Sequence, residues 1–153
     1  MRKILLALIL SMFAFSHSMA SENNIIVQKI KGNFSDVDKS MRDAILGQGI
    51  SLAHVLHASD MLKRTGKDFG YDQDVYANAE ILEFCSARIS QKLARIDPDN
   101  IILCPFTISL YTLIKEPDMV YIVYQIPVGK PGTKKVVAEV VELIQGIIEE
   151  ATF

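Results

Sequence analysis

The chain has 153 residues, of which 50% are hydrophobic and 22% charged, and its formal net charge is −2 at pH 7. This length and composition fit one domain with a sizeable apolar core, whereas a disordered chain would be poorer in apolar residues and more highly charged. Two cysteines allow at most one internal bridge, which excludes a disulfide-dense small scaffold. The slightly acidic balance offers no electrostatic footprint for nucleic acid, so no nucleic-acid partner is expected.

The N-terminal segment 1–20 has the layout of a cleaved secretory signal peptide. Arg2 and Lys3 form a short positive region, the apolar run Ile4–Phe15 follows, and Ser18-Met19-Ala20 supplies small residues for cleavage after Ala20. The apolar run is shorter than the roughly 20 residues that span a bilayer. The alternative is a buried N-terminal helix, although no polar face interrupts the run. We therefore expect a single mature domain over 21–153, periplasmic or secreted, without stable membrane insertion.

Along the mature chain, apolar periodicity and breaker residues predict the element order β-α-β-α-β-α-β-β-α. The predicted strands are Ile25–Ile30, Ile50–His57, Asn78–Cys85, Ile101–Cys104 with Phe106–Leu113, and Val120–Ile126. The predicted helices begin near Ser35, Ser59, Ser86 and Thr133, and the last extends to Glu150. The fold class is therefore α/β of the α+β two-layer type, with helices packed on a mixed sheet of about five strands.

The register of the last predicted hairpin follows from side-chain parity. Pairing Leu110 with Ile122, Ile108 with Tyr124 and Phe106 with Ile126 keeps one face of the hairpin apolar. A slip of one residue would set Ile108 against Gln125 and mix the faces, so the first register is predicted.

The last predicted helix has an unusually broad apolar surface. Its eight large aliphatic residues are Val136, Val137, Val140, Val141, Leu143, Ile144, Ile147 and Ile148. One side of the helix carries Val137, Val141 and Ile148, and we expect this flank to contact a second copy in a symmetric homodimer. The alternative is a monomer in which the helix is central, packed between the sheet and a neighbouring helix, because that position produces the same pattern.

Several short motifs, taken in their order along the chain, resemble the family called domain of unknown function 302. They are Gly49-Ile50-Ser51, Val55-Leu56-His57-Ala58, Glu83-Phe84-Cys85, Asp97-Pro98, the run from Leu103 to Tyr111, Val120-Tyr121-Ile122-Val123-Tyr124 and Pro127. The resemblance covers Ile25–Val128 and implies a compact α/β fold, often a dimer in crystals, with no established activity. Many members read Pro-Cys where this chain has Cys104-Pro105, so no role is carried over to this cysteine.

His54 and His57 are the two histidines of the predicted mature chain. On the predicted strand their odd spacing points them to opposite faces, so they cannot share a metal ion. His57 is the stronger candidate ligand-binding residue because it ends the strand and lies within the resemblance. The alternative is a hydrogen-bonded structural histidine.

Cys85 and Cys104 lie at the ends of two predicted strands and are expected to meet an oxidising compartment. Three states remain open: a disulfide, two unpaired buried thiols, or a redox or metal site. A metal site would need a third ligand within reach, for which Glu83 is the candidate. The sequence identifies no particular metal or cofactor.

Tyr111 and Tyr121 are expected to pair across the predicted hairpin, with Thr107 and Ser109 beside them and Gln125 opposite Thr107. One interpretation is a polar and aromatic wall of a ligand groove. The alternative is a half-exposed sheet face stabilised by a cross-strand aromatic pair.

Motifs for common enzyme classes are missing from the sequence, including a nucleophile elbow, a phosphate loop, a dinucleotide fingerprint and a zinc-protease motif. This favours a non-enzymatic ligand-binding or accessory protein, with His57, Tyr111 and Tyr121 as candidate ligand-binding residues for a small ligand. The alternative is a thiol redox or metal-handling protein that uses Cys85, Cys104 and His57.

Overall fold

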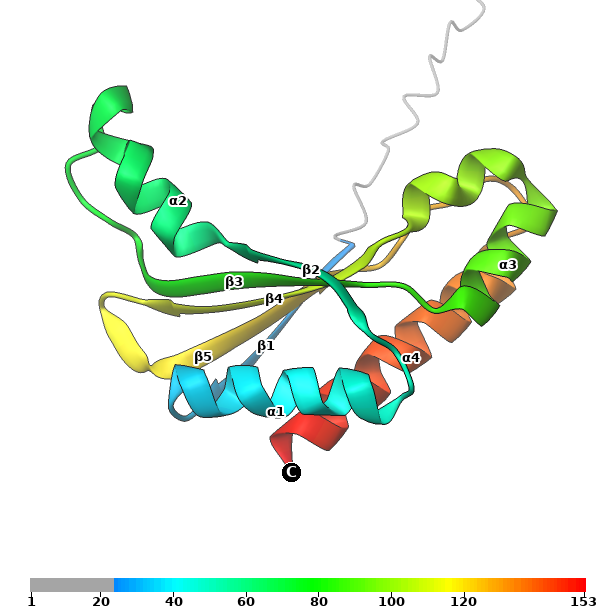
Figure 1. Cartoon of the computed structure of the whole chain (residues 1–153), viewed down its shortest axis with the longest axis horizontal. Helices are drawn as coiled ribbons and strands as arrows, with labels where there is room; N and C mark the ends of the chain where they lie inside the picture. Colours follow the sequence, from blue (N-terminus) through cyan, green and yellow to red (C-terminus); the bar gives the residue numbers. More distant parts are fainter. Residues whose placement is uncertain (1–23) are drawn as a thin grey trace, which may run out of the picture.

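The computed structural model describes residues 24–153, and the predicted signal peptide lies outside the described residues. One five-stranded sheet has the order β1-β5-β4-β3-β2 (Figure 1). Its strands are β1 (Ile25–Lys31), β2 (Leu52–His57), β3 (Tyr76–Phe84), β4 (Phe106–Leu113) and β5 (Glu116–Gln125). The helices are α1 (Phe34–Gly47), α2 (Ala58–Thr65), α3 (Ala87–Ile96) and α4 (Lys134–Thr152), with short 3₁₀ helices η1 (Gly66–Phe69) and η2 (Pro98–Leu103). The predicted class and element order are confirmed.

The sheet is antiparallel at every pairing, whereas the sequence predicts a mixed sheet. The helical connections from β2 to β3 and from β3 to β4 start and finish at the same end of the sheet. They therefore work as long hairpins, not as the crossovers that join parallel strands.

The apolar character of Ile101–Cys104 predicts a strand, and this prediction is wrong. The segment belongs largely to the 3₁₀ helix η2. Pro98 sits in the first turn, and the Asp97 carboxylate accepts a hydrogen bond from the Asp99 amide at 2.8 Å. These local interactions start a helical turn, and they outweigh the β propensity of two adjacent isoleucines.

The predicted hairpin register is correct in its centre, where Leu110 pairs with Ile122 and Tyr111 with Tyr121. The pairing ends at Ser109 and Val123, so the predicted pairs Ile108–Tyr124 and Phe106–Ile126 do not form. Pro105 and Pro127 stand just beyond these strand ends and have no N–H to extend a ladder. The central strands β4 and β5 therefore part at this end.

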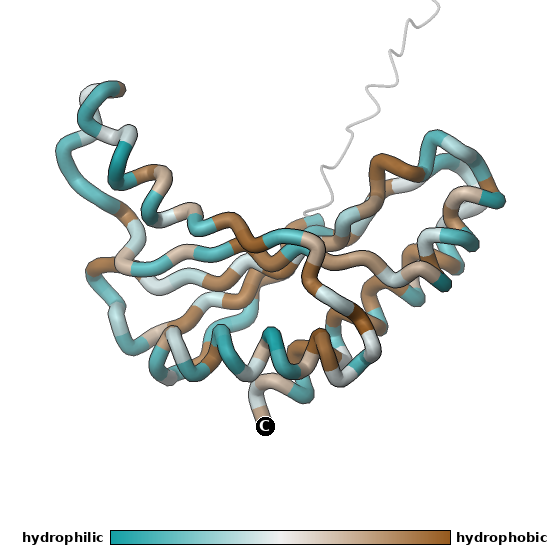
Figure 2. The backbone as a smooth tube through the Cα atoms, in the orientation of Figure 1, coloured by the Kyte–Doolittle hydropathy of each residue, from teal (hydrophilic) through white to brown (hydrophobic). Residues whose placement is uncertain are grey.

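The hydrophobic core lies between the sheet and α1, α3 and α4. Figure 2 shows apolar segments in the middle of the sheet and along α4. Fully buried side chains include Met41 and Ile45 of α1, Leu82 and Phe84 of β3, Ile108 and Leu110 of β4, and Ile144 and Ile147 of α4. No helix among residues 24–153 is long and apolar enough to cross a membrane.

Helix α4 is central, since it contacts both α1 and α3 while its apolar residues pack into the core. Ile148, assigned by the sequence to the dimer flank, is buried within one chain, and Val137 and Val141 are half-buried. Most of the broad apolar surface of α4 is therefore buried inside the monomer. The homodimer stays a prediction, although little of the apolar flank proposed for its interface is exposed.

The two faces of the sheet are covered differently. Figure 1 shows α1 and α4 against one face, while α2 rises away from the sheet at one end and η2 stands at the other. The residues of β4 make the asymmetry plain, since Phe106, Ile108, Leu110 and Thr112 are buried and the alternating residues are half-exposed. We call the sheet face that carries Thr107, Ser109, Tyr111 and Leu113 the open face.

Candidate functional site

His57 lies at the end of β2 with its ring on the helix-covered face, next to Glu80 of β3. Its Nδ1 is 2.9 Å from Glu80 Oε1, and an ionised carboxylate only accepts, so Nδ1 donates the proton. The other Glu80 oxygen accepts from Arg42 of α1, whose Nε donates to Asp38 at 2.7 Å. The hydrogen bond to Asp38 raises the pKa of Arg42. This network supports the structural interpretation of His57 and involves Glu80 and Arg42, which the sequence does not single out.

His54 and His57 are on opposite faces of β2, as their spacing predicts, because the pairing with β3 is regular between them. The His57 side chain is 59% exposed, so the ring closes no cavity by itself.

Tyr111 and Tyr121 meet on the open face, as the sequence predicts. Their rings stack with centroids 4.6 Å apart and planes at 9°. Tyr76 packs edge-on against Tyr111, and Lys29 lies over the other face of Tyr121 with its Nζ 4.6 Å from the centroid. Burial, followed by the two neighbouring tyrosines, raises the pKa of the Tyr111 hydroxyl.

This aromatic row supports the cross-strand interpretation more than a groove wall. Tyr121 is only 6% exposed, its ring is covered by Tyr111 and Lys29, and its hydroxyl donates to Glu116. Little ring surface is left to receive a ligand. Since His57 is on the opposite side of the sheet, the three residues do not converge on one pocket.

Cys85 and Cys104 form a disulfide, with their Cα atoms 6.0 Å apart. The bond joins the end of β3 to the segment before β4, and both residues are half-buried. His57 is level with Glu80, five positions before Cys85, which places it roughly 16 Å away along the strand. Within residues 24–153 no three His, Cys, Asp or Glu side chains are grouped to hold a metal ion, so the structure does not assemble the Cys–Cys–His site.

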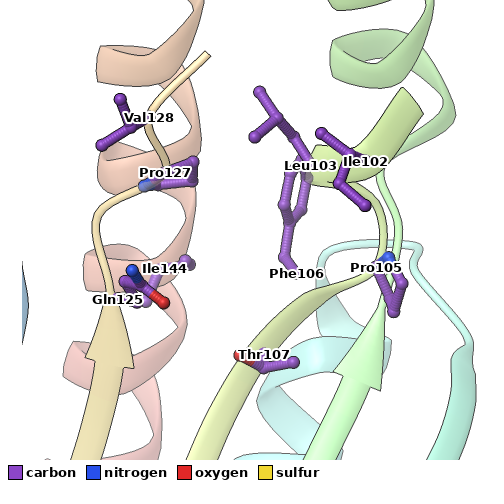
Figure 3. Close-up of a pocket in the computed structure, with 9 residues that line it drawn as sticks. All are labelled: Ile102, Leu103, Pro105, Phe106, Thr107, Gln125, Pro127, Val128 and Ile144. Atoms are coloured by element: carbon purple, nitrogen blue, oxygen red, sulfur yellow. The ribbon is translucent and has the colours of Figure 1, made fainter. Parts of the chain in front are cut away.

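A cleft of about 290 Å³ opens where β4 and β5 part (Figure 3). Figure 3 shows one wall from η2 and the start of β4 and a facing wall from the end of β5 and the loop after it, with α4 behind. Its lining residues are Ile102, Leu103, Pro105, Phe106, Thr107, Gln125, Pro127, Val128 and Ile144. The sequence places Gln125 opposite Thr107, but it does not predict the cleft, which exists only because the strands separate.

The two walls of the cleft are tied together by Asn100 of η2, which is 2% exposed. Its side-chain amide donates to the Leu93 carbonyl and its oxygen accepts from the Lys130 amide, each at 3.0 Å. Lys130 also pairs with Asp99 at 3.1 Å. A side chain at Gly129 would come within 3.0 Å of Leu103 Cδ1, so glycine permits this close approach of the walls. The cleft is therefore a pre-formed feature of the fold.

The described residues form an α/β domain with a cleft and without a recognisable catalytic constellation. The sequence profile of the family described as Domain of unknown function DUF302 matches residues 26–151. The chain belongs to this family.

A solved structure gives the same fold. The crystal structure of an uncharacterized conserved DUF302 protein from Bacillus stearothermophilus is similar with a TM-score of 0.69 and 12% sequence identity. The similarity covers 84% of this chain and 98% of that chain. No curated protein matches this chain.

Proposed function

We propose that this protein is an exported, non-enzymatic binding protein and that the cleft between the parted ends of β4 and β5 is its ligand site. The observation that carries the proposal is the cleft itself, an opening between two central strands that reaches Ile144 of α4. Side chains from separate elements line it, and Asn100 fixes the walls before any ligand arrives. Small-molecule sites are usually pre-formed cavities with a few placed polar groups. This cleft combines apolar side chains with the polar Thr107 and Gln125, and its volume of about 290 Å³ is just below the usual range.

The test compares two variants of the mature chain. Val128, which is 70% exposed, lines the cleft, whereas Val75, 62% exposed, lies at the opposite end of the sheet. Val128→Trp should fill the cleft and Val75→Trp should not. We expect a small molecule to co-purify with the wild type and with Val75→Trp in native mass spectrometry, and to be absent from Val128→Trp. If both variants retain the same molecule, or if neither it nor a neutral fragment library raises the melting temperature of the wild type, the proposal fails.

Export is a separate part of the proposal, supported by the positive, apolar and small-residue segments before Ser21. We expect N-terminal sequencing of the protein expressed with its full N-terminus to begin at Ser21, and fractionation to recover it from the periplasm or the medium. A cell-associated product that keeps Met1 would contradict this part alone.

Thiol redox chemistry is the second candidate function, because the disulfide lies beside the same cleft. Cys104 stands between the lining residues Leu103 and Pro105. The reduction potential separates the two roles. A structural bond is expected below about −300 mV and resists glutathione, whereas an exchanging bond has a higher potential.

A further inference from the structure

Where β4 and β5 part, the neighbouring strand pairings determine which way the main-chain N–H and C=O groups point. The Ile126 amide donates to the Asn24 carbonyl beyond β1 at 2.7 Å. In an antiparallel strand successive residues turn their N–H and C=O to alternate neighbours, so Gln125 turns both groups toward β4. Ser109 and Val123 are paired and turn their N–H and C=O groups toward each other. Thr107 and Gln125 are each two residues from that pair, so Thr107 lies opposite Gln125 and turns its N–H and C=O toward β5.

Thr107 and Gln125 nevertheless form no pair, since the β4–β5 ladder ends at Ser109 and Val123. The main-chain groups that Thr107 and Gln125 turn toward each other therefore border the cleft from its two walls, without the reciprocal bonds of a ladder pair. Main-chain polar groups withdrawn from water require partners, so a ligand that enters the cleft must supply them.

The rest of the lining restricts the ligand further. No charged side chain is among the nine lining residues, and the polar side chains are Thr107 and Gln125. The nearby Lys130 and Asp99 pair with each other. Aliphatic, proline and Phe106 side chains form the remaining surface, which favours an apolar group and penalises a charge that would lose its hydration.

From this geometry we infer that the cleft binds an uncharged, amide-bearing ligand with an apolar side group, whose N–H and C=O bond to the main chain of Thr107 and Gln125. A short extended segment of an apolar peptide and a small secondary amide share this chemistry. Recognition by main-chain groups at a strand edge is a general mode of peptide binding. The inference rests on the proposed function, because it names the ligand class of that cleft.

The experiment uses ¹⁵N-labelled mature chain and the probe N-acetyl-leucine N-methylamide. We expect the probe to shift the amide resonances of Thr107 and Gln125 and to slow their hydrogen exchange. N-acetyl-leucine methyl ester lacks one N–H and should bind about fivefold more weakly, since one hydrogen bond is lost. N-acetyl-leucine carries a carboxylate and should bind more weakly still. A longer capped peptide such as acetyl-Val-Leu-Val-amide separates the two sources: tighter binding indicates a peptide segment, equal binding a small amide.

Matched variants test the main-chain contact directly. Gln125→Pro removes the N–H that faces the cleft without removing a ladder bond, whereas Gln125→Ala removes only the side chain. We expect Gln125→Pro to lose binding about fivefold relative to Gln125→Ala.

Equal binding by the two Gln125 variants, or by the amide, ester and carboxylate probes, would overturn the inference. If Gln125→Pro fails to fold, the probe series still decides. The proposed function has a different failure: binding that survives Val128→Trp would show that the cleft is not the site.

Discussion

Glu80 divides its carboxylate between two partners, with one oxygen at His57 and the other at Arg42. The sequence identifies His57 as a residue of interest, but it does not identify Glu80. The pairing of these residues depends on the register of β2 on β3, which is interrupted by an irregularity between Leu52 and His54. A single-sequence parity argument cannot place such a shift, because one extra residue exchanges the faces.

At this residue we predict that Glu80→Gln lowers the free energy of unfolding by about 1 kcal/mol, because Arg42 and His57 lose a charged acceptor that is only partly exposed. Urea denaturation measures the change. Asp43→Asn, which breaks the solvent-exposed pair with Lys39, is the control and should cost clearly less than Glu80→Gln. Equal losses in the two variants would contradict a special role for Glu80.

Among the elements, α3 is held to α4 by Glu139, which accepts from Lys92 at 2.7 Å and from Arg88 at 3.3 Å. The hydrogen bond from Lys92 lowers the pKa of Glu139 from its usual 4.5. A carboxyl with a lowered pKa in the folded state stabilises the fold at neutral pH, and this contribution is lost as the pH falls through the lowered pKa.

We therefore predict that Glu139→Gln has a lower urea midpoint than the wild type at pH 7. The difference should shrink below pH 4.5 and disappear as the pH falls through the lowered pKa of Glu139. Glu149→Gln, at an exposed position on α4, is the control and should show no such pH dependence. A difference that persists unchanged at pH 3 would indicate a packing effect instead of an ionic one.

The disulfide spans 19 positions and closes the loop that contains α3 and η2. For a loop of this size the chain-entropy model gives about 3 kcal/mol of stabilisation. We predict this loss of unfolding free energy for the double variant Cys85→Ala, Cys104→Ala. The unfolding free energy of the wild type in a reducing agent should approach that of the variant. If it stays unchanged although the disulfide is fully reduced, the prediction is wrong.

The elements that the sequence predicts well are those whose signals are local. The cap at Ser86, the apolar spacing of α1, α3 and α4, and the centre of the β4–β5 register all appear in the structure. The predicted start of the first helix at Ser35 is slightly wrong, because the Asn33 side chain caps α1 and accepts from the Ser35 amide at 2.8 Å. The strand directions, the 3₁₀ helix η2 and the parting of β4 from β5 depend on how distant segments meet. For the same reason the sequence indicates Thr107 and Gln125 as neighbours without revealing the cleft between them.

At the scale of the whole molecule, the accessible part of α4 determines what interface a homodimer would use. If α4 carries a dimer interface, only Val137 and Val141 of its predicted flank are partly accessible, because Ile148 is buried. We predict that the mature chain sediments as a dimer at micromolar concentration and that Val137→Asp converts it to a monomer.

Phe69→Asp is the comparison variant, since this ring on η1 is exposed and distant from α4. It should leave the dimer intact. A wild type that sediments as a monomer would contradict the homodimer. A dimer that dissociates with Phe69→Asp but not with Val137→Asp would contradict an interface on α4.

The position of β1 has a consequence for the order in which the sheet is completed. Among the described residues β1 comes first in the chain, yet it pairs with β5, the last strand, with Ile25 opposite Gln125. When the chain emerges from a ribosome or a translocation pore, β1 must wait with its pairing edge unfilled until nearly the whole domain has followed. Closing so long a loop is slow compared with forming local hairpins. We therefore expect β2, β3 and β4 to assemble first, and a chain that ends before β5 to expose β1 to proteases and to aggregation.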